Sequence, residues 1–448
     1  MHTARPTSKR WRQRQRRTKE REAQQAETRR ITSNERLKAR RIKRNERHLQ
    51  TENDVKEKMQ FTKDATMSHT APCYMEVQQR PESECNALLA RHRAIAHDDE
   101  IFTNYKKITG QKSCLIYCLD TTYWEKSVDA ELNHTKSDDT TEVVFVVSIE
   151  LYKDMDATRR RHYQWMFDYL RHDAASRPTI KGKSEGSKSG NHAMLGGAMK
   201  GMGWRAGYEH GYDIGTYAAM PAARRRIQND DQFRKAFMEH SRDGALEFHR
   251  RMARNLYAMS PKLHYDRVCE AKQHAIPMFG YGCKDAFNAT ASIDITQLLP
   301  EDALFSPHII YTYDGFVNKP HRDNDNNIWA SGLFAALDVT SGKLLDKHDT
   351  TGYHFYNATY GILLDIASCE GVVNVAWRGK LDVHGTTTGH FGVDGNTTRY
   401  AATSQLNKRT DEAAVRCMKT NTLRAKDEIV RYNLGEDYVT ANLASAPK

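Results

Sequence analysis

The hydrophobic pattern of the chain changes near residue 300. From there to about residue 410, short runs of β-branched and aromatic residues alternate with turn residues. Such runs predict β-strands, which we place at 308–317, 332–339, 360–366, 372–377, 381–386 and 399–406. Short strands at this even spacing are typical of two sheets folded into a jelly roll. We therefore predict an α+β fold with a double-stranded β-helix (jelly-roll) core at residues 301–410 and flanking helices.

Residues 61–300 show mostly helical spacing. An amphipathic helix is predicted by apolar residues at i, i+3, i+4 and i+7, namely Tyr163, Met166, Phe167 and Leu170. A second helix, or a helix pair interrupted near Gly244, is marked by Phe233, Phe237, Phe248, Met252, Leu256 and Met259. Val143–Ile149 instead predicts a buried strand. We expect a mainly helical region packed on the core, with the first core strands coming from 143–152.

Ten glycines lie between residues 177 and 217. Gly182-Lys183-Ser184 suggests a phosphate-binding loop, but the glycine that such a loop needs five positions earlier is absent. We therefore exclude nucleotide binding here. A flexible loop facing the substrate fits the glycine content, with Trp204 and Arg205 able to stack on or pair with a ligand. A packing loop that needs glycine for close backbone approach fits equally well.

Positive charge is concentrated at the start of the chain. The formal net charge is +11, and residues 1–60 hold 20 lysines and arginines against 8 acidic residues, so the rest is close to neutral. This segment has too few apolar residues to bury a face, and we predict a disordered or solvated helical arm. Its cluster Lys38–Arg44 suits nucleic-acid phosphates or nuclear import; a solubilising tail is the alternative. Residues 411–448 predict a helix from Asp411 to about Tyr432 and a polar end.

The eight cysteines contain no Cys-x-x-Cys pair and no histidine spacing suited to zinc. We expect buried free thiols in a reducing compartment. The first residues lead directly into basic positions without an apolar stretch, and no apolar run reaches the length that crosses a bilayer. Together with the basic arm, these features predict a soluble nuclear protein with no membrane partner.

Candidate chemistry lies at the triplet His321-Arg322-Asp323, with His384 and then Arg399 behind it. Two imidazoles and one carboxylate can hold three adjacent positions on an Fe(II) ion and leave the others open. The triplet follows a predicted strand, and both later residues are expected on or beside strands. This context separates it from other His-x-Asp triplets in the chain.

Two such triplets begin at His97 and His264. His97 lies in a charged, alanine-rich stretch that indicates a helix, and His264 follows a Ser-Pro break after a helix. Neither is followed at a useful distance by a histidine and an arginine on strands. We therefore regard both as spacing coincidences.

The candidate site resembles the oxygenase domain of the TET/JBP family, and most closely its compact fungal members. The resemblance rests on His321–Asn327, on Trp377–Thr386 with its Arg-Gly-x-x-x-x-His-Gly-Thr pattern, and on Arg399, 15 residues after the distal histidine. It is specific from about residue 308 to 405. It implies an enzyme that uses Fe(II), 2-oxoglutarate and O2 to oxidise methyl groups on nucleic-acid bases.

The resemblance implies that His321, Asp323 and His384 are the catalytic iron ligands. Arg399 would form a bidentate pair with the far carboxylate of 2-oxoglutarate. His354 stands close to the position of a second cosubstrate histidine; a surface histidine is the alternative. Because a methyl group inside a duplex cannot reach a buried iron, the target nucleotide would be flipped out of the DNA.

The resemblance also bears on the substrate. Asn326 matches an asparagine that contacts the target base, and Asp325 stands where animal members carry histidine. An ionised carboxylate only accepts hydrogen bonds, so Asp325 would favour bases with an exocyclic amine over thymine. We expect 5-methylcytosine first, N6-methyladenine second and methylated RNA third. The Cys-rich zinc region of animal members is absent, and Asn407 stands where the family can stack a histidine on the base.

Two other classes of function fit parts of the sequence. A catalytically silent DNA-binding protein of a mobile element would keep the fold and use the arm and a groove for binding, although the complete triad and Arg399 argue against it. An oxygenase acting on RNA, on a small molecule or on a protein would make the basic arm incidental.

Overall fold

A computed structural model describes most of the chain beyond the basic arm. The residues described are 72–122, 142–180, 194–206, 214–217, 219–274, 276–280, 292–296, 299–392 and 395–420. The predicted arm at 1–60 lies outside them, as does the predicted C-terminal helix beyond residue 420. Within these ranges no helix is long and apolar enough to cross a membrane.

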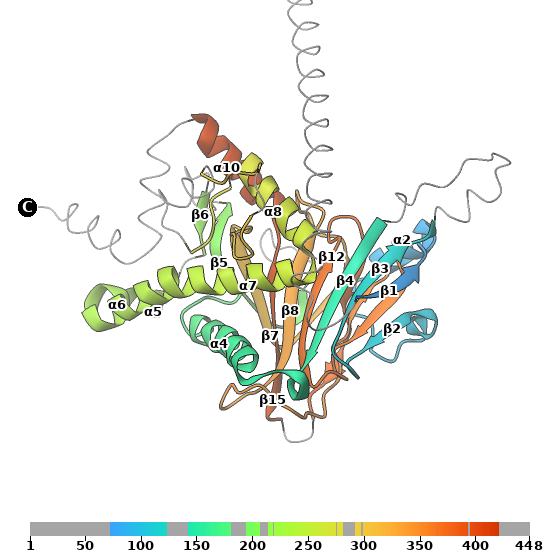
Figure 1. Cartoon of the computed structure of the whole chain (residues 1–448). Coiled ribbons are helices and arrows are strands. Elements are labelled where there is room, and N and C mark those ends of the chain that lie inside the picture. The colour runs from blue at the N-terminus through green and yellow to red at the C-terminus, as the bar shows by residue number, and fades with distance from the viewer. Residues whose placement is uncertain are drawn as a thin grey trace, which may run out of the picture. The chain divides into compact units, whose positions relative to one another are not determined.

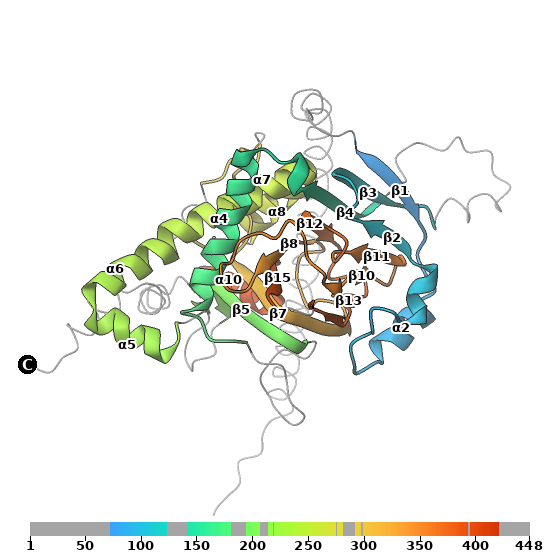
Figure 2. The same ribbon diagram turned by 90° about the horizontal axis from the view of Figure 1, so that it is seen from below.

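Thirteen strands of the described residues form one mixed sheet that curls into a half-barrel, as Figure 2 shows from below. Along the sheet the order is β1 (Cys73–Val77), β3 (Cys114–Asp120), β4 (Glu142–Leu151), β12 (Gly371–Trp377), β8 (Ala330–Asp338), β15 (Thr397–Ser404), β7 (His308–His321), β13 (His384–Thr386), β10 (Phe355–Asn357), β11 (Ile362–Asp365) and β2 (Lys106–Thr109). β5 (Met194–Ala206) pairs with β7, and β6 (Ile214–Thr216) pairs with β5. A separate pair is formed by β9 (Thr351–Gly352) and β14 (Gly389–His390).

Strand β7 joins the two halves of the curled sheet. Its first half pairs with β15, and its end pairs with β13, where His321 lies opposite His384. Between these pairings Asp314 and Gly315 adopt positive φ angles of 55° and 67°. Glycine takes this conformation readily and aspartate more easily than most residues. The irregular stretch lets one strand serve both halves, which places the two histidines on neighbouring strands.

The apolar core lies between the two halves of the sheet. Phe355 on β10 packs against rings from three strands of the other half, with centroid distances of 6.0 Å to Phe145, 6.1 Å to Phe334 and 5.0 Å to Trp377. All four side chains are buried. The ring of Phe355 also stacks on His384 at 5.9 Å. The candidate site therefore lies directly against the core of the jelly roll.

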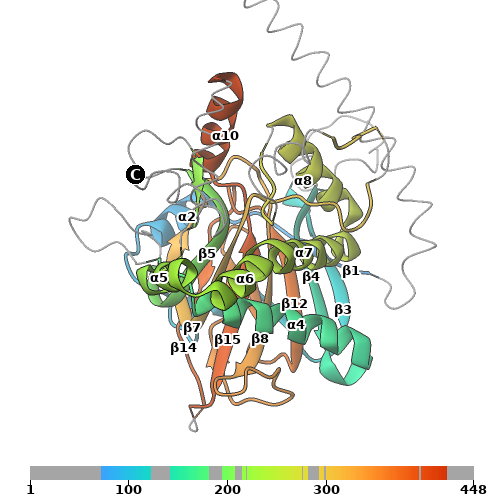
Figure 3. The same ribbon diagram turned by 90° about the vertical axis from the view of Figure 1, so that its left-hand side faces the viewer.

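Helices cover one outer face of the sheet (Figures 1 and 3). They are α4 (Ala157–Ala174), α5 (Pro221–Asn229), α6 (Asp231–Glu239), α7 (Ala245–Met259) and α8 (Pro261–Gln273). By contrast, α2 (Glu82–Leu89) lies beside the other half of the sheet, near β2 and β11, and α10 (Lys408–Thr420) lies at one end of the sheet. Short 3-10 turns lie at Glu100–Asn104 and Tyr152–Asp154. α4 and α7 cross the strands, and the predicted apolar face of α4 is buried. Between α6 and α7, a π-helical turn at His240–Gly244 lies where the pattern predicted an interruption.

A buried ionic cluster attaches α4 to β7. Asp173 of α4 is completely buried and accepts hydrogen bonds from Arg177 Nε at 3.1 Å and from the Tyr311 hydroxyl at 2.8 Å. Nε2 of His240 lies 3.3 Å from the same carboxylate. Burial alone would raise the pKa of Asp173, but Arg177 and His240 hold it at about 2. The cluster is an internally neutralised part of the fold.

The strands predicted after residue 300 agree with the structure, whereas the prediction for residues 61–300 is wrong in part. Within the described residues this region is richer in helix than in strand, but β1 to β5 all join the large sheet, so the jelly roll is not confined to 301–410. The strand expected at 143–152 lies inside the sheet, between β3 and β12. β1 and β2 are short and largely exposed, which leaves little hydrophobic periodicity for sequence reasoning to detect.

The glycine-rich stretch also needs correction, because Met194–Ala206 is a strand and not a loop. At Gly197, where φ is 72°, an added Cβ would lie 2.4 Å from the backbone of Phe316 in β7. At Gly203, where φ is 90°, it would lie 2.5 Å from the carbonyl oxygen of Pro307. Glycine here permits close approach of two paired backbones, the second of the two interpretations above.

Candidate metal and cosubstrate site

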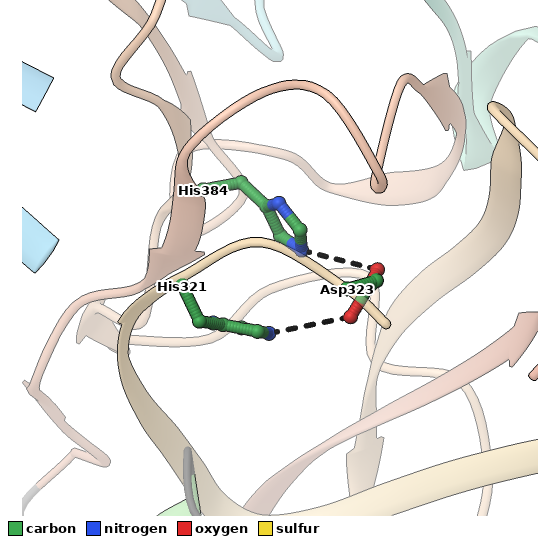
Figure 4. Close-up of side chains that lie close together, drawn as sticks. All are labelled: His321, Asp323 and His384. Carbon is green, nitrogen blue, oxygen red and sulfur yellow. Dashed lines mark ion pairs between the residues drawn. The ribbon is translucent and has the colours of Figure 1, made fainter. Parts of the chain in front are cut away.

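Three side chains meet where β7 and β13 lie side by side (Figure 4). His321 ends β7, Asp323 follows two residues later, and His384 begins β13. Nε2 of His321 lies 3.5 Å from Oδ1 of Asp323, and Nε2 of His384 lies 3.4 Å from Oδ2. One ligand atom from each residue lies within 4.8 Å of the others, a spacing that a single metal ion can bridge.

Both imidazoles are oriented by their second nitrogen. Nδ1 of His321 lies 2.8 Å from the carbonyl oxygen of Lys319, and Nδ1 of His384 lies 2.9 Å from that of Asp382. A carbonyl oxygen only accepts hydrogen bonds, so in each neutral ring Nδ1 carries the proton. Nε2 then keeps its lone pair facing Asp323. This is the state that binds a metal ion.

Asp323 is held in place by the strand end that carries the other histidine. Its backbone N–H donates to the carbonyl oxygen of Gly379 at 2.8 Å. A Cβ on Gly379 would lie 2.5 Å from Oδ2 of Asp323, so only glycine leaves room for this carboxylate. Oδ2 is buried and accepts no hydrogen bond within the described structure. A buried, unsatisfied carboxylate oxygen between two imidazole lone pairs fits a bound cation.

The charges of the three residues are coupled. Burial alone would raise the pKa of Asp323, but His384 and His321 hold it well below its usual value. Burial alone would lower the pKa of His384, but Asp323 raises it. Without a metal ion, the carboxylate and a protonated imidazole would neutralise each other. With a metal ion, the same carboxylate supplies the negative ligand.

A buried polar network supports the turn before His384. The carboxylate of Asp382 accepts hydrogen bonds from Arg378 Nη2 at 3.1 Å and from Asn357 Nδ2 at 3.1 Å. Arg378 also donates to the Tyr360 hydroxyl at 2.6 Å. Because the main-chain oxygen of Asp382 holds the His384 ring, this network positions a metal ligand.

Arg399 is 5% exposed and lies on the interior face of β15. Its Nη2 donates to the carbonyl oxygen of Phe316 at 3.3 Å, while Nη1 is buried without a hydrogen-bond partner. The guanidinium carbon lies 5.2 Å from the Tyr353 ring and 5.8 Å from the Phe334 ring, which belongs to the aromatic cluster touching His384. Burial lowers the pKa of Arg399 to about 9. No carboxylate of the described residues pairs with it, so the site fits an acidic ligand.

His354 is 9% exposed, so it is not the surface histidine of the alternative interpretation. Its backbone N–H donates to the Thr387 hydroxyl at 2.9 Å, and its Nδ1 lies 3.1 Å from Oδ1 of Asp365. It directly follows Tyr353, whose ring faces Arg399. Asp365 is thus the acidic neighbour of the ring, and the role of His354 toward the cosubstrate stays a prediction.

Asp325 and Asn326 follow Asp323 on the same segment. Asp325 is 3% exposed, and its Oδ1 is buried without a hydrogen-bond partner. Burial, and then the charge of Asp323, raise the pKa of Asp325 well above its usual value. A carboxyl group that keeps its proton can donate as well as accept, so an acceptor-only Asp325 does not follow from these surroundings. Asn326 is half-buried, and its amide donates to Asp411 of α10.

Trp204 and Arg205 lie on β5 and contact the protein itself. Trp204 is 1% exposed, and its indole N–H donates to the carbonyl oxygen of Met278 at 3.1 Å, as expected for a packing residue. Arg205 donates from Nε to the carbonyl oxygen of Thr216 at 3.1 Å, across the β5–β6 hairpin. Asn407 accepts the backbone N–H of Arg409 at 3.0 Å at the start of α10. None of these contacts involves the metal cluster.

Sequence reasoning missed the residues that support the ligands. Gly379 and Asp382 lie inside the Trp377–Thr386 motif, whose spacing drew attention only to the histidine. His274 and Asp411 are 137 residues apart, and their pairing has no signal in a single sequence. Contacts of this kind depend on how helices pack against the sheet.

Comparison with known protein families agrees with this geometry. Residues 171–389 match the model of the Tet-like 2OG-Fe(II) oxygenase superfamily, a range that contains all three members of the metal cluster and ends before Arg399. A search of curated proteins found no match. The closeness to compact fungal members stays a prediction. Residues 171–389 therefore carry a Tet-like 2OG-Fe(II) oxygenase superfamily domain, and the Fe(II), 2-oxoglutarate and O2 that this family uses fit the metal cluster inside this range and Arg399 after it, which has no carboxylate partner among the described residues.

Proposed function

We propose that this protein hydroxylates the methyl group of a methylated DNA base, with 5-methylcytosine as the preferred substrate and N6-methyladenine as the second. The observation that carries the proposal is the arrangement around the metal cluster. Arg399, a buried cation with no carboxylate partner among the described residues, lies by the aromatic cluster that contacts His384, and the segment that carries Asp325 and Asn326 follows directly from a metal ligand. Arg399 suits a dicarboxylate cosubstrate, and the segment with Asp325 and Asn326 offers polar atoms to a substrate.

Each group has a separate task in this proposal. His321, Asp323 and His384 would hold Fe(II), which together with 2-oxoglutarate and O2 supplies oxidative decarboxylation coupled to hydroxylation. Arg399 would bind the far carboxylate of 2-oxoglutarate through two charge-assisted hydrogen bonds. Asp325 and Asn326 would contact the polar edge of the flipped base. The buried ring of Phe355 would help exclude water beside His384.

We further propose that DNA is the partner and that the basic arm at 1–60 binds its phosphates in the nucleus. Phosphate contacts by such a segment give affinity without sequence preference and make it fall steeply with salt. Deleting residues 1–60 should lower DNA affinity and flatten its salt dependence, with turnover of a free methylated nucleoside unchanged. Equal affinity and salt dependence with and without the arm would contradict this part of the proposal.

The decisive experiment measures succinate and hydroxymethylated base together. The full chain is supplied with Fe(II), ascorbate, O2, 2-oxoglutarate and oligonucleotides that contain 5-methylcytosine, N6-methyladenine or thymine. We expect coupled formation of both products on the first substrate, and no product from His321→Ala. Tight DNA binding without turnover would favour a catalytically silent DNA-binding protein. If succinate formation is coupled only to oxidation of RNA, of a small molecule or of a protein, the result would favour an oxygenase with that substrate.

Asp325→Ala tests the contribution of the buried carboxyl group to base choice. We expect conversion of 5-methylcytosine to fall by about tenfold or more, because a buried polar partner of the base is removed. An unchanged rate with Asp325→Ala would exclude Asp325 from substrate contact. Equal activity of the wild type on thymine would contradict the expected preference for amine-bearing bases.

A further inference from the structure

Asn326 is joined to two helices by a chain of polar contacts. Its side-chain amide donates to the carboxylate of Asp411 on α10, and Nδ1 of His274, just after α8, lies 2.8 Å from both oxygens of that carboxylate. Asp411 is 2% exposed. Figure 1 shows α8 and α10 close together at one end of the sheet. The contact between these distant parts of the chain is therefore built into the packing of the fold.

The backbone of Asn326 is also fixed on both sides. Its N–H donates to the carbonyl oxygen of Leu406 at 3.0 Å, and its carbonyl oxygen accepts from Lys380 Nζ at 2.9 Å. With backbone and side chain both held, the amide group has little freedom to turn. Asn326 is nevertheless half-buried and not fully enclosed, so part of it can be reached.

The carboxylate of Asp411 determines which end of the amide is available. A carboxylate accepts hydrogen bonds, so the amide end that faces it is the NH2 group. The opposite end is then Oδ1, an acceptor, and no donor in the described structure reaches it. If residue 411 were able to donate, the amide could take either orientation. The chemistry of Asp411 therefore sets the polarity of Asn326.

Asn326 lies on the segment that leads out of the metal cluster. It lies three positions after Asp323, and the intervening Asp325 interacts electrostatically with both Asp323 and His384. The N–H of Asp323 and the Nζ of Lys380 anchor this segment to the stretch before His384. The segment that carries this acceptor is thus tied to the strand end that bears the metal ligand His384.

We propose that Asp411 and His274 are positioning residues that make the substrate pocket an acceptor site, by holding Asn326 with Oδ1 directed at the substrate. The inference rests on the proposed function. The substrate class that fits is a base with an N–H next to its methyl-bearing position. 5-Methylcytosine presents an amine at C4, whereas thymine presents a carbonyl oxygen there, which would face Oδ1 with two acceptors opposed. Asp411 on α10 and His274 just after α8 then determine the preference for 5-methylcytosine over thymine, although neither binds the iron.

The test is the ratio of kcat/KM for 5-methylcytosine over thymine, measured on single-stranded oligonucleotides that differ only in the target base. The wild type should favour 5-methylcytosine by at least about tenfold, because the carbonyl oxygen of thymine would face Oδ1 without a hydrogen bond. Asp411→Asn can donate to Asn326 and let its amide turn, so this ratio should fall toward one. A general loss of folding or of iron would lower both rates and leave the ratio unchanged.

The control is Glu412→Ala, a change at the next, exposed position of α10, which should keep the wild-type ratio. If Asp411→Asn does not fold, His274→Gln, which weakens the hold on Asp411, should shift the ratio in the same direction. A variant that converts 5-methylcytosine and keeps the wild-type ratio overturns the inference and leaves the proposed function standing. A wild type that converts neither base overturns both.

Discussion

Two buried arginines are linked to strand β7, and only one of them has a carboxylate partner in the described structure. Arg177 is 8% exposed and pairs with Asp173 on the helix-covered face, where Tyr311 also contacts that aspartate. Arg399 is 5% exposed, lies on the interior face, and leaves Nη1 without a hydrogen bond. Their burial is nearly equal, so burial does not distinguish them.

The difference lies in how each charge is compensated. Burial alone would lower the pKa of Arg177, but Asp173 raises it. Burial lowers the pKa of Arg399 to about 9, and no carboxylate among the described residues opposes this effect. A fold keeps a buried, unpaired cation only at a cost in stability. The internally neutralised Arg177 therefore belongs to the structure, whereas the uncompensated Arg399 marks the place of an acidic ligand.

The largest effect on stability is expected from Arg177→Met. The change leaves the fully buried carboxylate of Asp173 without its arginine, and breaking a buried ion pair on one side costs about 3 kcal/mol or more. Urea unfolding should show this loss in the free energy of unfolding, while the KM for 2-oxoglutarate of the folded protein stays unchanged. A stability equal to that of the wild type would show that His240 and Tyr311 neutralise Asp173 without Arg177.

Replacing Arg399 by methionine should weaken cosubstrate binding and leave the stability of the fold intact. Arg399→Met removes both charge-assisted hydrogen bonds to the cosubstrate, so the KM for 2-oxoglutarate should rise by about a hundredfold. The free energy of unfolding without ligand should not fall, because no internal partner loses its charge. An excess of 2-oxoglutarate should raise the melting temperature of the wild type and not that of this variant. If Arg399→Met lowers the free energy of unfolding and keeps the wild-type KM, Arg399 stabilises the fold and does not bind the cosubstrate.

The smallest expected effect is the loss of unfolding free energy when Asp173 is protonated at low pH. The pKa of Asp173 is about 2 in the folded protein and 3.8 for the free side chain, so the folded state favours the ionised form. Its contribution, about 2 kcal/mol, is fully present above roughly pH 4 and is lost as the pH falls toward 2. The difference in unfolding free energy between the wild type and Asp173→Asn should therefore shrink over this range. A constant difference between pH 5 and pH 2 would contradict the ion pair.

The part of the fold after residue 300 could be predicted because its strands are apolar and bounded by turn residues. The metal ligands could be found because His321 and Asp323 are only two positions apart in sequence and His384 belongs to a motif of fixed spacing. The strands before residue 300 were harder to predict. β1 and β2 are short, and β5 is rich in glycine, so backbone pairing with distant strands decides their conformation.

The sequence by itself determined which residues can bind a metal ion and the strands that carry them, because strand periodicity and ligand type are local properties. Only the tertiary structure decided which charges are compensated. Asp173 meets a tyrosine 138 residues away, Arg399 meets no carboxylate of the described residues, and Asp411 meets Asn326 across 85 residues. Hydrogen bonds and ion pairs act over a few ångströms in space. Pairings between distant residues are therefore set by the packing of helices on the curled sheet, which a single sequence does not display.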